Sequence, residues 1–300
     1  MGEPLVLSHG SAVLFLAVLA DGRLAGGGLD RDGTIKLWPP DGVGEPVVLS
    51  HGSSVWSLAV LADGRLASGG GNGQIKLWPR DGVGEPVVLS HGSRVLSLTG
   101  LADGQLASGG EDGHIKLWPP DSAGEPRDIQ AHLGGWVWSL AALSDGRLAS
   151  GSFDGRIILL PREVISISRP GGEFAIDAFQ HGGFGSSVQS LAVLADGRLA
   201  SGGDDGNIKI WPKEGSGEPV VLSQGDRIRS LAVLADGRLA SGGFDGTIKL
   251  WLVDEQKLIA ALCLRAGRNL AKAEWARYIG SDTSWQPGCR DLPSNWRTPD

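Results

Sequence analysis

The stretch LADGRLASGGFDGTIKLW, residues Leu234–Trp251, recurs along the chain and decides the fold. Near copies end at Trp38, Trp78, Trp118 and Trp211, and a degenerate copy, LSDGRLASGSFDGRIILL, ends at Leu160. The first aspartates of the copies are spaced by 42, 40, 42, 51 and 40 residues and are Asp21, Asp63, Asp103, Asp145, Asp196 and Asp236. A period near 40 residues indicates a repeat architecture, in which each unit stacks on the next. We therefore expect one repeat domain over residues 1–251 and an extension over residues 252–300.

The second unit shows why each unit is expected to form four strands. Its short apolar runs are rich in β-branched residues and are separated by turn residues; they are Pro46–Ser50, Val55–Leu61, Arg65–Gly70 and Gln74–Trp78. The turns contain Ala62-Asp63-Gly64 and Asn72-Gly73, residue types that tolerate the left-handed conformations of tight hairpins. Strands this short with such turns predict an antiparallel meander and leave no room for a helix.

A single four-stranded sheet cannot cover its own apolar faces, but several sheets packed around an axis can, as in a β-propeller. Most units also share a histidine shortly before a valine (four positions before it at His9, His51 and His91), a Ser-Gly pair, an Asp-Gly turn and an Ile-Lys-Leu-Trp strand or a close variant of it. This pattern resembles the WD-repeat (WD40) propellers over roughly residues 3–251. The tryptophan is followed by Pro or Leu rather than Asp, which concerns turn detail. The resemblance implies an all-β, six-bladed propeller of four-stranded antiparallel blades.

In that family a His, a Ser or Thr, an Asp and the Trp form a hydrogen-bonded tetrad within each blade. By resemblance, complete tetrads fall at His91, Ser108, Asp112 and Trp118, and at His181, Ser201, Asp205 and Trp211. The pattern is impaired by Gly26, Asn72, Leu160 and Gln224 in the other units. Five of the six histidines occupy this structural position, so we interpret them as tetrad members and expect no metal site among them.

The two ends of the repeat region suggest how the ring is completed. Residues Glu3–Ser8 match Glu218–Ser223, an outer strand, whereas the last unit supplies only three strands ending at Trp251. We expect the N-terminal strand to pair with the last blade and close the ring, because this removes an open sheet edge. Lys257–Leu262 is a competing strand, although Asp254–Gly267 carries the capping and helix-forming residues of a helix.

The C-terminal extension predicts two short helices and an irregular end. The second helix is expected over Leu270–Ile279, capped by Asn269 and stopped by Gly280. The segment from Gly267 to Cys289 is similar to one that follows WD repeats in large bacterial multidomain signalling proteins, which carry NTPase, kinase or protease-like modules upstream. This similarity implies a sensor domain of a longer polypeptide.

Composition and motifs exclude several classes of function. A net charge of −7 argues against nucleic-acid binding, which requires a cationic face. Two cysteines, Cys263 and Cys289, make no disulfide framework, and the sequence contains no leader or long apolar segment, so we expect a cytoplasmic protein without membrane contact. Catalytic motifs, phosphate loops and cofactor fingerprints are missing, and Asp30-Arg31-Asp32-Gly33 lacks the further carboxylates that calcium needs. We expect no enzyme and no cofactor.

The positions at which near-identical units differ indicate a recognition surface. Some of these positions flank the valine or isoleucine that opens one strand of each unit, and the others directly precede the turn aspartate. In the WD40 family, which the units resemble, these positions face the narrow end of the channel. The candidates for partner binding are Trp56, Arg94, Trp136, Trp138, Phe153, Gln189, Arg227, Arg229 and Phe244. Trp and Arg are enriched at binding hot spots, although large side chains here could simply plug the channel. Two functions stay open: a scaffold for a protein or peptide, including an upstream domain of the same polypeptide, and a propeller that binds a small ligand or glycan.

Overall fold

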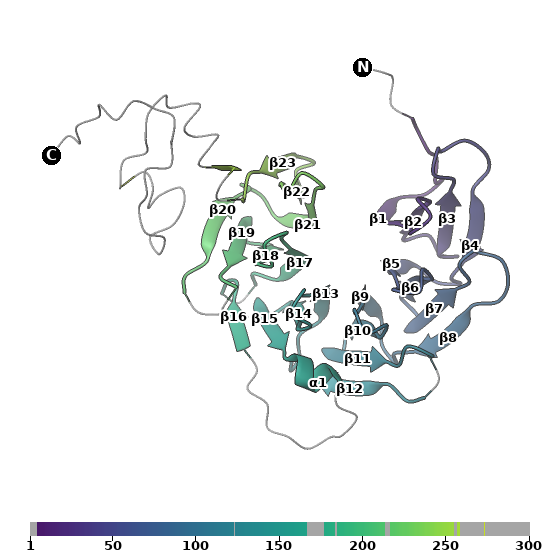
Figure 1. The fold of residues 1–300 in the computed structure, drawn as a ribbon, viewed down its shortest axis with the longest axis horizontal. Helices are drawn as coiled ribbons and strands as arrows, with labels where there is room; N and C mark the ends of the chain where they lie inside the picture. The colour runs from purple at the N-terminus through teal and green to yellow at the C-terminus, as the bar shows by residue number, and fades with distance from the viewer. Residues whose placement is uncertain are drawn as a thin grey trace.

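The computed structural model describes residues 5–122, 124–166, 177–183, 185–213, 217–254, 257–258 and 273. The chain folds into six antiparallel sheets arranged around a central axis, which confirms an all-β six-bladed propeller (Figure 1). Blade 1 comprises β1 (Val13–Val18), β2 (Leu24–Gly28), β3 (Thr34–Trp38) and β4 (Val47–Ser50). Blade 2 comprises β5 (Val55–Val60), β6 (Leu66–Gly70), β7 (Gln74–Trp78) and β8 (Val87–Ser90). Blade 3 comprises β9 (Val95–Gly100), β10 (Leu106–Gly110), β11 (His114–Trp118) and β12 (Arg127–Gln130).

Blades 4 and 5 repeat this order, and blade 6 has three described strands. Blade 4 comprises β13 (Val137–Ala142), β14 (Leu148–Ser152), β15 (Arg156–Leu160) and β16 (Asp177–Gln180). Blade 5 comprises β17 (Val188–Val193), β18 (Leu199–Gly203), β19 (Asn207–Trp211) and β20 (Val220–Ser223). Blade 6 comprises β21 (Ile228–Val233), β22 (Leu239–Gly243) and β23 (Ile248–Trp251). The strand bounds expected for the second unit agree with the structure to within one residue at each end.

Successive blades interlock through a β-branched side chain and a glycine. The residue that opens the inner strand of blades 2 to 6 is completely buried in every case: Val55, Val95, Val137, Val188 and Ile228. Each lies against a glycine in the second strand of the preceding blade. A Cβ atom at Gly109, for example, would lie 2.5 Å from Val137 Cγ1. The glycine is therefore required because a close approach between blades leaves no room for a side chain.

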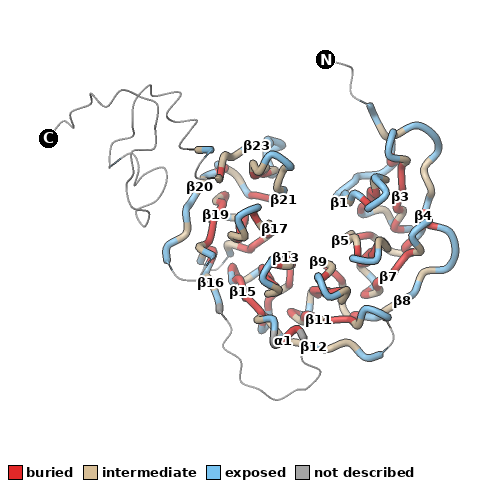
Figure 2. Tube along the Cα trace, in the orientation of Figure 1, coloured by how far each residue is buried: buried red, intermediate tan, exposed pale blue. Residues whose placement is uncertain are grey.

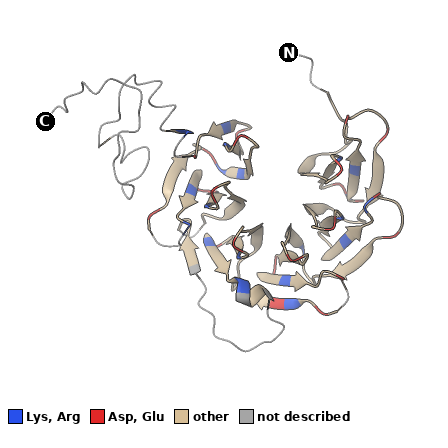
Figure 3. Ribbon diagram, viewed as in Figure 1, with Lys and Arg blue, Asp and Glu red and all other residues tan. Residues whose placement is uncertain are grey.

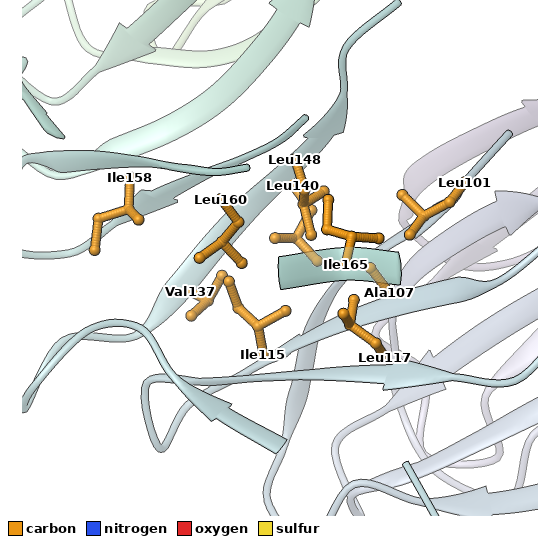
Figure 4. Packing of buried hydrophobic residues seen from close by; sticks show 10 residues of the cluster. All are labelled: Leu101, Ala107, Ile115, Leu117, Val137, Leu140, Leu148, Ile158, Leu160 and Ile165. Carbon is orange, nitrogen blue, oxygen red and sulfur yellow. The ribbon is translucent and has the colours of Figure 1, made fainter. Parts of the chain in front are cut away.

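A second contact recurs at the seams between blades. The backbone N–H of Leu140 donates to Ser97 Oγ of the preceding blade at 2.9 Å, and Leu98, Leu191 and Leu231 make the same bond to Ser57, Ser139 and Ser190. Buried leucines and isoleucines of both blades fill the rest of each seam, as Figure 4 shows around Leu140 and Leu160 between blades 3 and 4. Burial accordingly runs along the second and third strands, with exposed residues on the turns (Figure 2).

One element was not expected from the sequence, the helix α1 (Arg162–Ser166) in the longest interval between units. Val164 and Ile165 are buried, and Ile165 belongs to the apolar cluster between blades 3 and 4. The prediction that the units leave no room for a helix was wrong here, because the additional residues after β15 form a turn of helix that covers this seam.

The predicted closure of the ring by an N-terminal strand is also wrong for the described residues. Leu5–Ser8 form no strand, and among the described residues the sheet of blade 6 consists of β21, β22 and β23. Figure 1 shows the N-terminal segment beside blade 1 and an opening between β1 and blade 6. The packing of successive blades sets the curvature, and five such steps do not bring blade 6 back to blade 1.

The expected helices of the C-terminal extension lie almost entirely outside the described residues, as do Cys263 and Cys289. In the part of the chain that is described, no helix has the length and apolarity to cross a bilayer. Lysines and arginines recur on the third strands, with acidic residues largely in the turns, so both signs of charge are interspersed around the ring (Figure 3).

Candidate functional site: the rim of the channel

The candidate residues lie at one end of the channel, where inner strands begin and second strands end. The backbone N–H of Phe153 donates to Trp136 O at 3.0 Å, and that of Phe244 donates to Arg227 O at 2.8 Å. Equivalent bonds join Glu111 to Arg94 and Asp204 to Ser187. The two sets of variable positions therefore meet within each blade. We call this surface the rim, defined by Trp56, Arg94, Glu111, Trp136, Trp138, Phe153, Ser187, Gln189, Asp204, Arg227, Arg229 and Phe244.

A β-bulge recurs at the start of every inner strand. The register of the inner strand shifts at Trp56 in blade 2, Trp138 in blade 4, Gln189 in blade 5 and Arg229 in blade 6. A bulge leaves one residue out of the regular ladder and turns its side chain away from the alternation of the strand. Each blade can therefore present a different side chain at this position without disturbing its sheet.

Blade 4 presents an aromatic cluster. The rings of Trp136 and Trp138 lie 5.4 Å apart between centroids at 61°, and Trp136 lies 5.6 Å from Phe153. Phe153 is 47% exposed. The indole Nε1 of Trp138 is buried and has no partner among the described residues. The cluster thus combines an open apolar surface with one unused hydrogen-bond donor.

Arg94 lies at the boundary between blades 2 and 3. Its guanidinium is 5.2 Å from the ring centroid of Trp56, and Nη1 is 3.4 Å from Glu111 Oε2. A cation over an indole and a carboxylate beside it hold the side chain in place. Its Nε atom is buried without a partner in the described part of the chain.

Blade 5 carries a polar cluster that includes Gln189. Ser187 Oγ donates to Asp204 Oδ2 at 2.8 Å, and Gln189 Nε2 donates to the same oxygen at 3.2 Å. The other carboxylate oxygen, Oδ1, is buried and unpaired within the described residues. Asp204 and Ser187 were not among the candidates for partner binding, although a Ser and a carboxylate at variable positions beside Gln189 were a signal in the sequence.

Blade 6 contributes two arginines on one aromatic ring. The guanidinium carbons of Arg227 and Arg229 lie 5.6 and 5.2 Å from the ring centroid of Phe244, which is 64% exposed. Neither arginine forms an ion pair with a described carboxylate. This part of the rim is open to an anionic group.

The described residues of the rim form separate groups of side chains. Its candidates lie in four groups, each within one blade or across two neighbouring blades, rather than in one cluster. Three of the seven buried polar atoms without a partner among the described residues lie on the rim, namely Arg94 Nε, Trp138 Nε1 and Asp204 Oδ1; three of the others are nitrogens of tetrad histidines. Buried polar groups are normally hydrogen-bonded, so a bound molecule or water would complete these two donors and one acceptor.

The tetrads lie inside the blades and are separate from the rim. In blade 3, Ser108 Oγ lies 2.8 Å from both His91 Nδ1 and Trp118 Nε1, and His91 Nε2 is 3.5 Å from Asp112. In blade 5, Ser201 joins His181 at 2.7 Å and Trp211 at 2.8 Å, and His181 Nε2 is 3.2 Å from Asp205. The longer loop after His181 therefore still permits the tetrad.

Blades 1, 2 and 6 show how an impaired tetrad is accommodated. In blade 2, Ser68 still joins His51 and Trp78, each at 2.8 Å. In blade 6, Ser241 Oγ donates to Gln224 Oε1 at 2.6 Å, so glutamine takes the place of histidine. In blade 1, where Gly26 provides no hydroxyl, His9 Nε2 lies 3.2 Å from the Gly26 carbonyl oxygen.

Burial lowers the pKa of two tetrad histidines, His51 and His132. Desolvation lowers the pKa of His132 to about 4, and desolvation together with the charge of Lys76 lowers the pKa of His51 to about 4. Both side chains are therefore neutral in the folded protein at pH 7. The unfolded chain binds a proton near pH 6.5, so stability is full above that pH and falls as the pH drops from 6.5 to 4.

We expect His132→Gln to flatten this acid dependence. A pKa lowered from 6.5 to about 4 corresponds to about 3 kcal/mol of unfolding free energy lost over that interval. Glutamine already fills the equivalent position at Gln224, so the variant keeps a partner for Ser150. Melting temperatures from pH 7 to pH 4 check this: wild type should fall more steeply than the variant. Parallel curves would refute the assignment.

These features define the class of protein, a repeat-built β-propeller with a variable rim at one end of its channel. The sequence matches the family described as "WD domain, G-beta repeat" at residues 2–39, 44–79, 84–119, 125–159, 178–212 and 219–251. The chain therefore belongs to the WD40 family.

Comparison with solved structures gives the same fold. The structure entitled "Structure of U3-55K" is similar with a TM-score of 0.70 and 22% sequence identity, over 83% of this chain and 80% of that chain. A search of curated proteins found no match.

Proposed function

We propose that this chain is a non-catalytic scaffold that binds a protein or peptide partner through the rim. WD40 propellers generally serve as interaction scaffolds. The observation that supports the rim most strongly is that side chains which differ between blades share one surface with three buried polar atoms that have no partner among the described residues. The residues that hold each blade together are the same in nearly every unit, whereas the residues of the rim differ from unit to unit.

The chemistry of the rim suggests what the partner carries. The cluster of Trp136, Trp138 and Phe153 offers an apolar surface for a bulky side chain, with Trp138 Nε1 as a donor beside it. Arg227 and Arg229 provide positive charge in blade 6, whereas the charge of Arg94 is balanced by Glu111. A peptide with an aromatic or large aliphatic residue and a carboxylate fits both features.

A second candidate is a glycan or another small ligand that stacks on the same aromatic rings. The exposed ring of Phe153 beside Trp136 favours this alternative. An upstream domain of a longer polypeptide is a further form of the peptide hypothesis, consistent with the similarity of the C-terminal extension to that of bacterial signalling proteins.

The test is parallel binding to a peptide library of varied charge and apolar content and to a glycan array. We expect saturable binding to acidic peptides with a bulky apolar residue and none to glycans. The double variant Trp138→Ala with Arg229→Ala should weaken peptide affinity at least tenfold, because each removes a large contact of hot-spot type. Lys213→Ala, at the opposite end of the blades, should bind as wild type does.

Two results would contradict the proposal. Unchanged affinity in the double variant would remove the rim from consideration, provided that its melting temperature matches wild type. Binding to glycans with none to peptides would select the second candidate.

A further inference from the structure

We propose that the opening between blade 6 and blade 1 is a docking site for one further β-sheet of the same repeat pattern, presented by a partner. This inference is independent of the rim, which uses other residues at the end of the channel. It rests on three observations: an unpaired face on blade 6, an unpaired face on blade 1, and the position of Leu5–Ser8.

Blade 6 presents the face that the other blades bury against their successors. A Cβ atom at Gly242 would meet no atom within 4 Å, whereas at the equivalent Gly69, Gly109, Gly151 and Gly202 it would lie 2.5 to 2.6 Å from the next blade. Ile248 and Leu250 of β23 are 75% and 50% exposed, although their counterparts in blade 3, Ile115 and Leu117, are 0% and 2% exposed. Ser230, which corresponds to the seam acceptors Ser57 and Ser97, is exposed as well.

Blade 1 presents the complementary face. Val13 is 38% exposed, although the five residues at its position in the other blades are completely buried. Leu16 is 64% exposed. Val13, Leu16, Leu24 and Trp38 line a cavity of about 630 Å³ together with the segment Val6–Ser11. Blade 1 therefore offers the β-branched residue, Val13, and blade 6 offers the glycine, Gly242. Elsewhere in the ring, a pair of this kind forms the seam between neighbouring blades.

The segment Leu5–Ser8 already lies where the outer strand of a preceding blade would lie. Lys36 Nζ donates to Ser8 O at 3.1 Å, as Lys76 Nζ donates to Ser50 O, in the outer strand of blade 1, at 3.2 Å. A Cβ atom at Gly42 would contact Leu5 and Leu7, as one at Gly82 would contact Val47 and Leu49 of that outer strand. The N-terminal segment is therefore held in the geometry of a fourth strand whose sheet is not formed by described residues.

These observations identify the occupant by its chemistry. It must offer a β-branched side chain to Gly242, a glycine to Val13, and a third strand whose free edge pairs with Leu5–Ser8. Three strands of this repeat pattern satisfy all three requirements, and Leu5–Ser8 would supply the fourth. The partner thus carries a short antiparallel sheet with an Ile-x-Leu edge strand, which binds by sheet completion and apolar packing.

The first experiment measures whether the opening has the width of one blade. Spin labels are placed at the exposed alanine of the same turn in different blades, with Cys263→Ser and Cys289→Ser as the background: Ala20→Cys in blade 1 is paired with Ala62→Cys, Ala102→Cys or Ala235→Cys. The distance from Ala20 to Ala235 is expected to match that from Ala20 to Ala102, two blades apart. It is expected to exceed the distance from Ala20 to Ala62, which are in neighbouring blades.

The second experiment provides the occupant. A copy of residues 51–84 placed directly before Glu3 continues the repeat without a break, since Gly84 also precedes Glu85-Pro86. This seven-unit chain should keep the distance from Ala20 to Ala235 and melt at least about 5 °C higher, because two further seams are buried. Gly242→Ala should lower the melting temperature of the seven-unit chain and leave that of the six-unit chain unchanged or slightly raised.

Three results would overturn the proposal. A distance from Ala20 to Ala235 equal to that between neighbouring blades would show that the six-unit ring closes on itself. A six-unit chain that light scattering shows as a dimer, with Gly242→Ala making it monomeric, would assign the opening to a second copy. A seven-unit chain with an unchanged melting temperature and a protease-sensitive added unit would show that the opening does not accept a blade.

Discussion

Replacement of Trp118 with alanine is expected to lower the free energy of unfolding by about 3–5 kcal/mol, the usual cost of truncating a buried aromatic residue. Trp118 is 4% exposed and packs in the apolar cluster between blades 2 and 3. Its indole N–H donates to Ser108 Oγ at 2.8 Å, so the change also removes one bond of the tetrad. Thermal or urea unfolding measures the loss, which corresponds to a decrease of about 10 °C in melting temperature.

Trp251 is the matched control for this prediction. It makes the same bond, to Ser241 Oγ at 2.7 Å, but it is only partly buried in the apolar cluster between blades 5 and 6. We expect Trp251→Ala to cost less than half as much as Trp118→Ala. Equal losses would mean that Trp251 is as well packed between blades 5 and 6 as Trp118 is between blades 2 and 3.

Gly109→Ala is expected to destabilise the protein by about 1–3 kcal/mol, because overpacking of a tight interior contact displaces its neighbours. The new Cβ would lie 2.5 Å from Val137 Cγ1 and 2.8 Å from Val137 Cβ. Val137 is completely buried and β-branched, so it has no free rotamer into which to retreat. Equilibrium unfolding measures the lost free energy. In the double variant Gly109→Ala with Val137→Ala, the smaller side chain at position 137 should recover part of it.

Recovery distinguishes a seam clash from a general intolerance of alanine in β10. Without any recovery, the contact between Gly109 and Val137 would not be the cause of the loss. The coupling between the two substitutions is the relevant quantity, since neighbouring residues rarely have additive effects.

The repeat period and the alternation of strands and turns were sufficient to predict most of the fold. The runs Val55–Leu61 and Gln74–Trp78 predicted strands that the structure contains as β5 and β7. Local signals determine these elements, because each strand is short and its hairpin follows directly in sequence. The helix α1 was missed because five residues are too short to show a helical period.

The closure of the ring could not be predicted in this way. Leu5–Ser8 and Val220–Ser223 are similar in sequence, but similarity does not specify which sheet edge a strand joins. That choice depends on the angle between successive blades, which arises from contacts such as Gly109 with Val137 and has no local signature. The same limit applies at the rim, where the sequence indicated Trp138 and Arg229 but not the bulges that orient them.

The central structural claim is that the six blades form an open arc in which blade 6 has no neighbour on its outer side. The most direct test compares the change in unfolding free energy caused by Gly242→Ala with the change caused by Gly109→Ala. The two glycines lie at the same position of the same LASGG strand, in blade 6 and blade 3. With nothing within 4 Å of its new Cβ, Gly242→Ala should be neutral or stabilising by up to about 1 kcal/mol, because alanine reduces the entropy of the unfolded chain. A loss equal to that of Gly109→Ala would contradict the account, since it would place another side chain against Gly242.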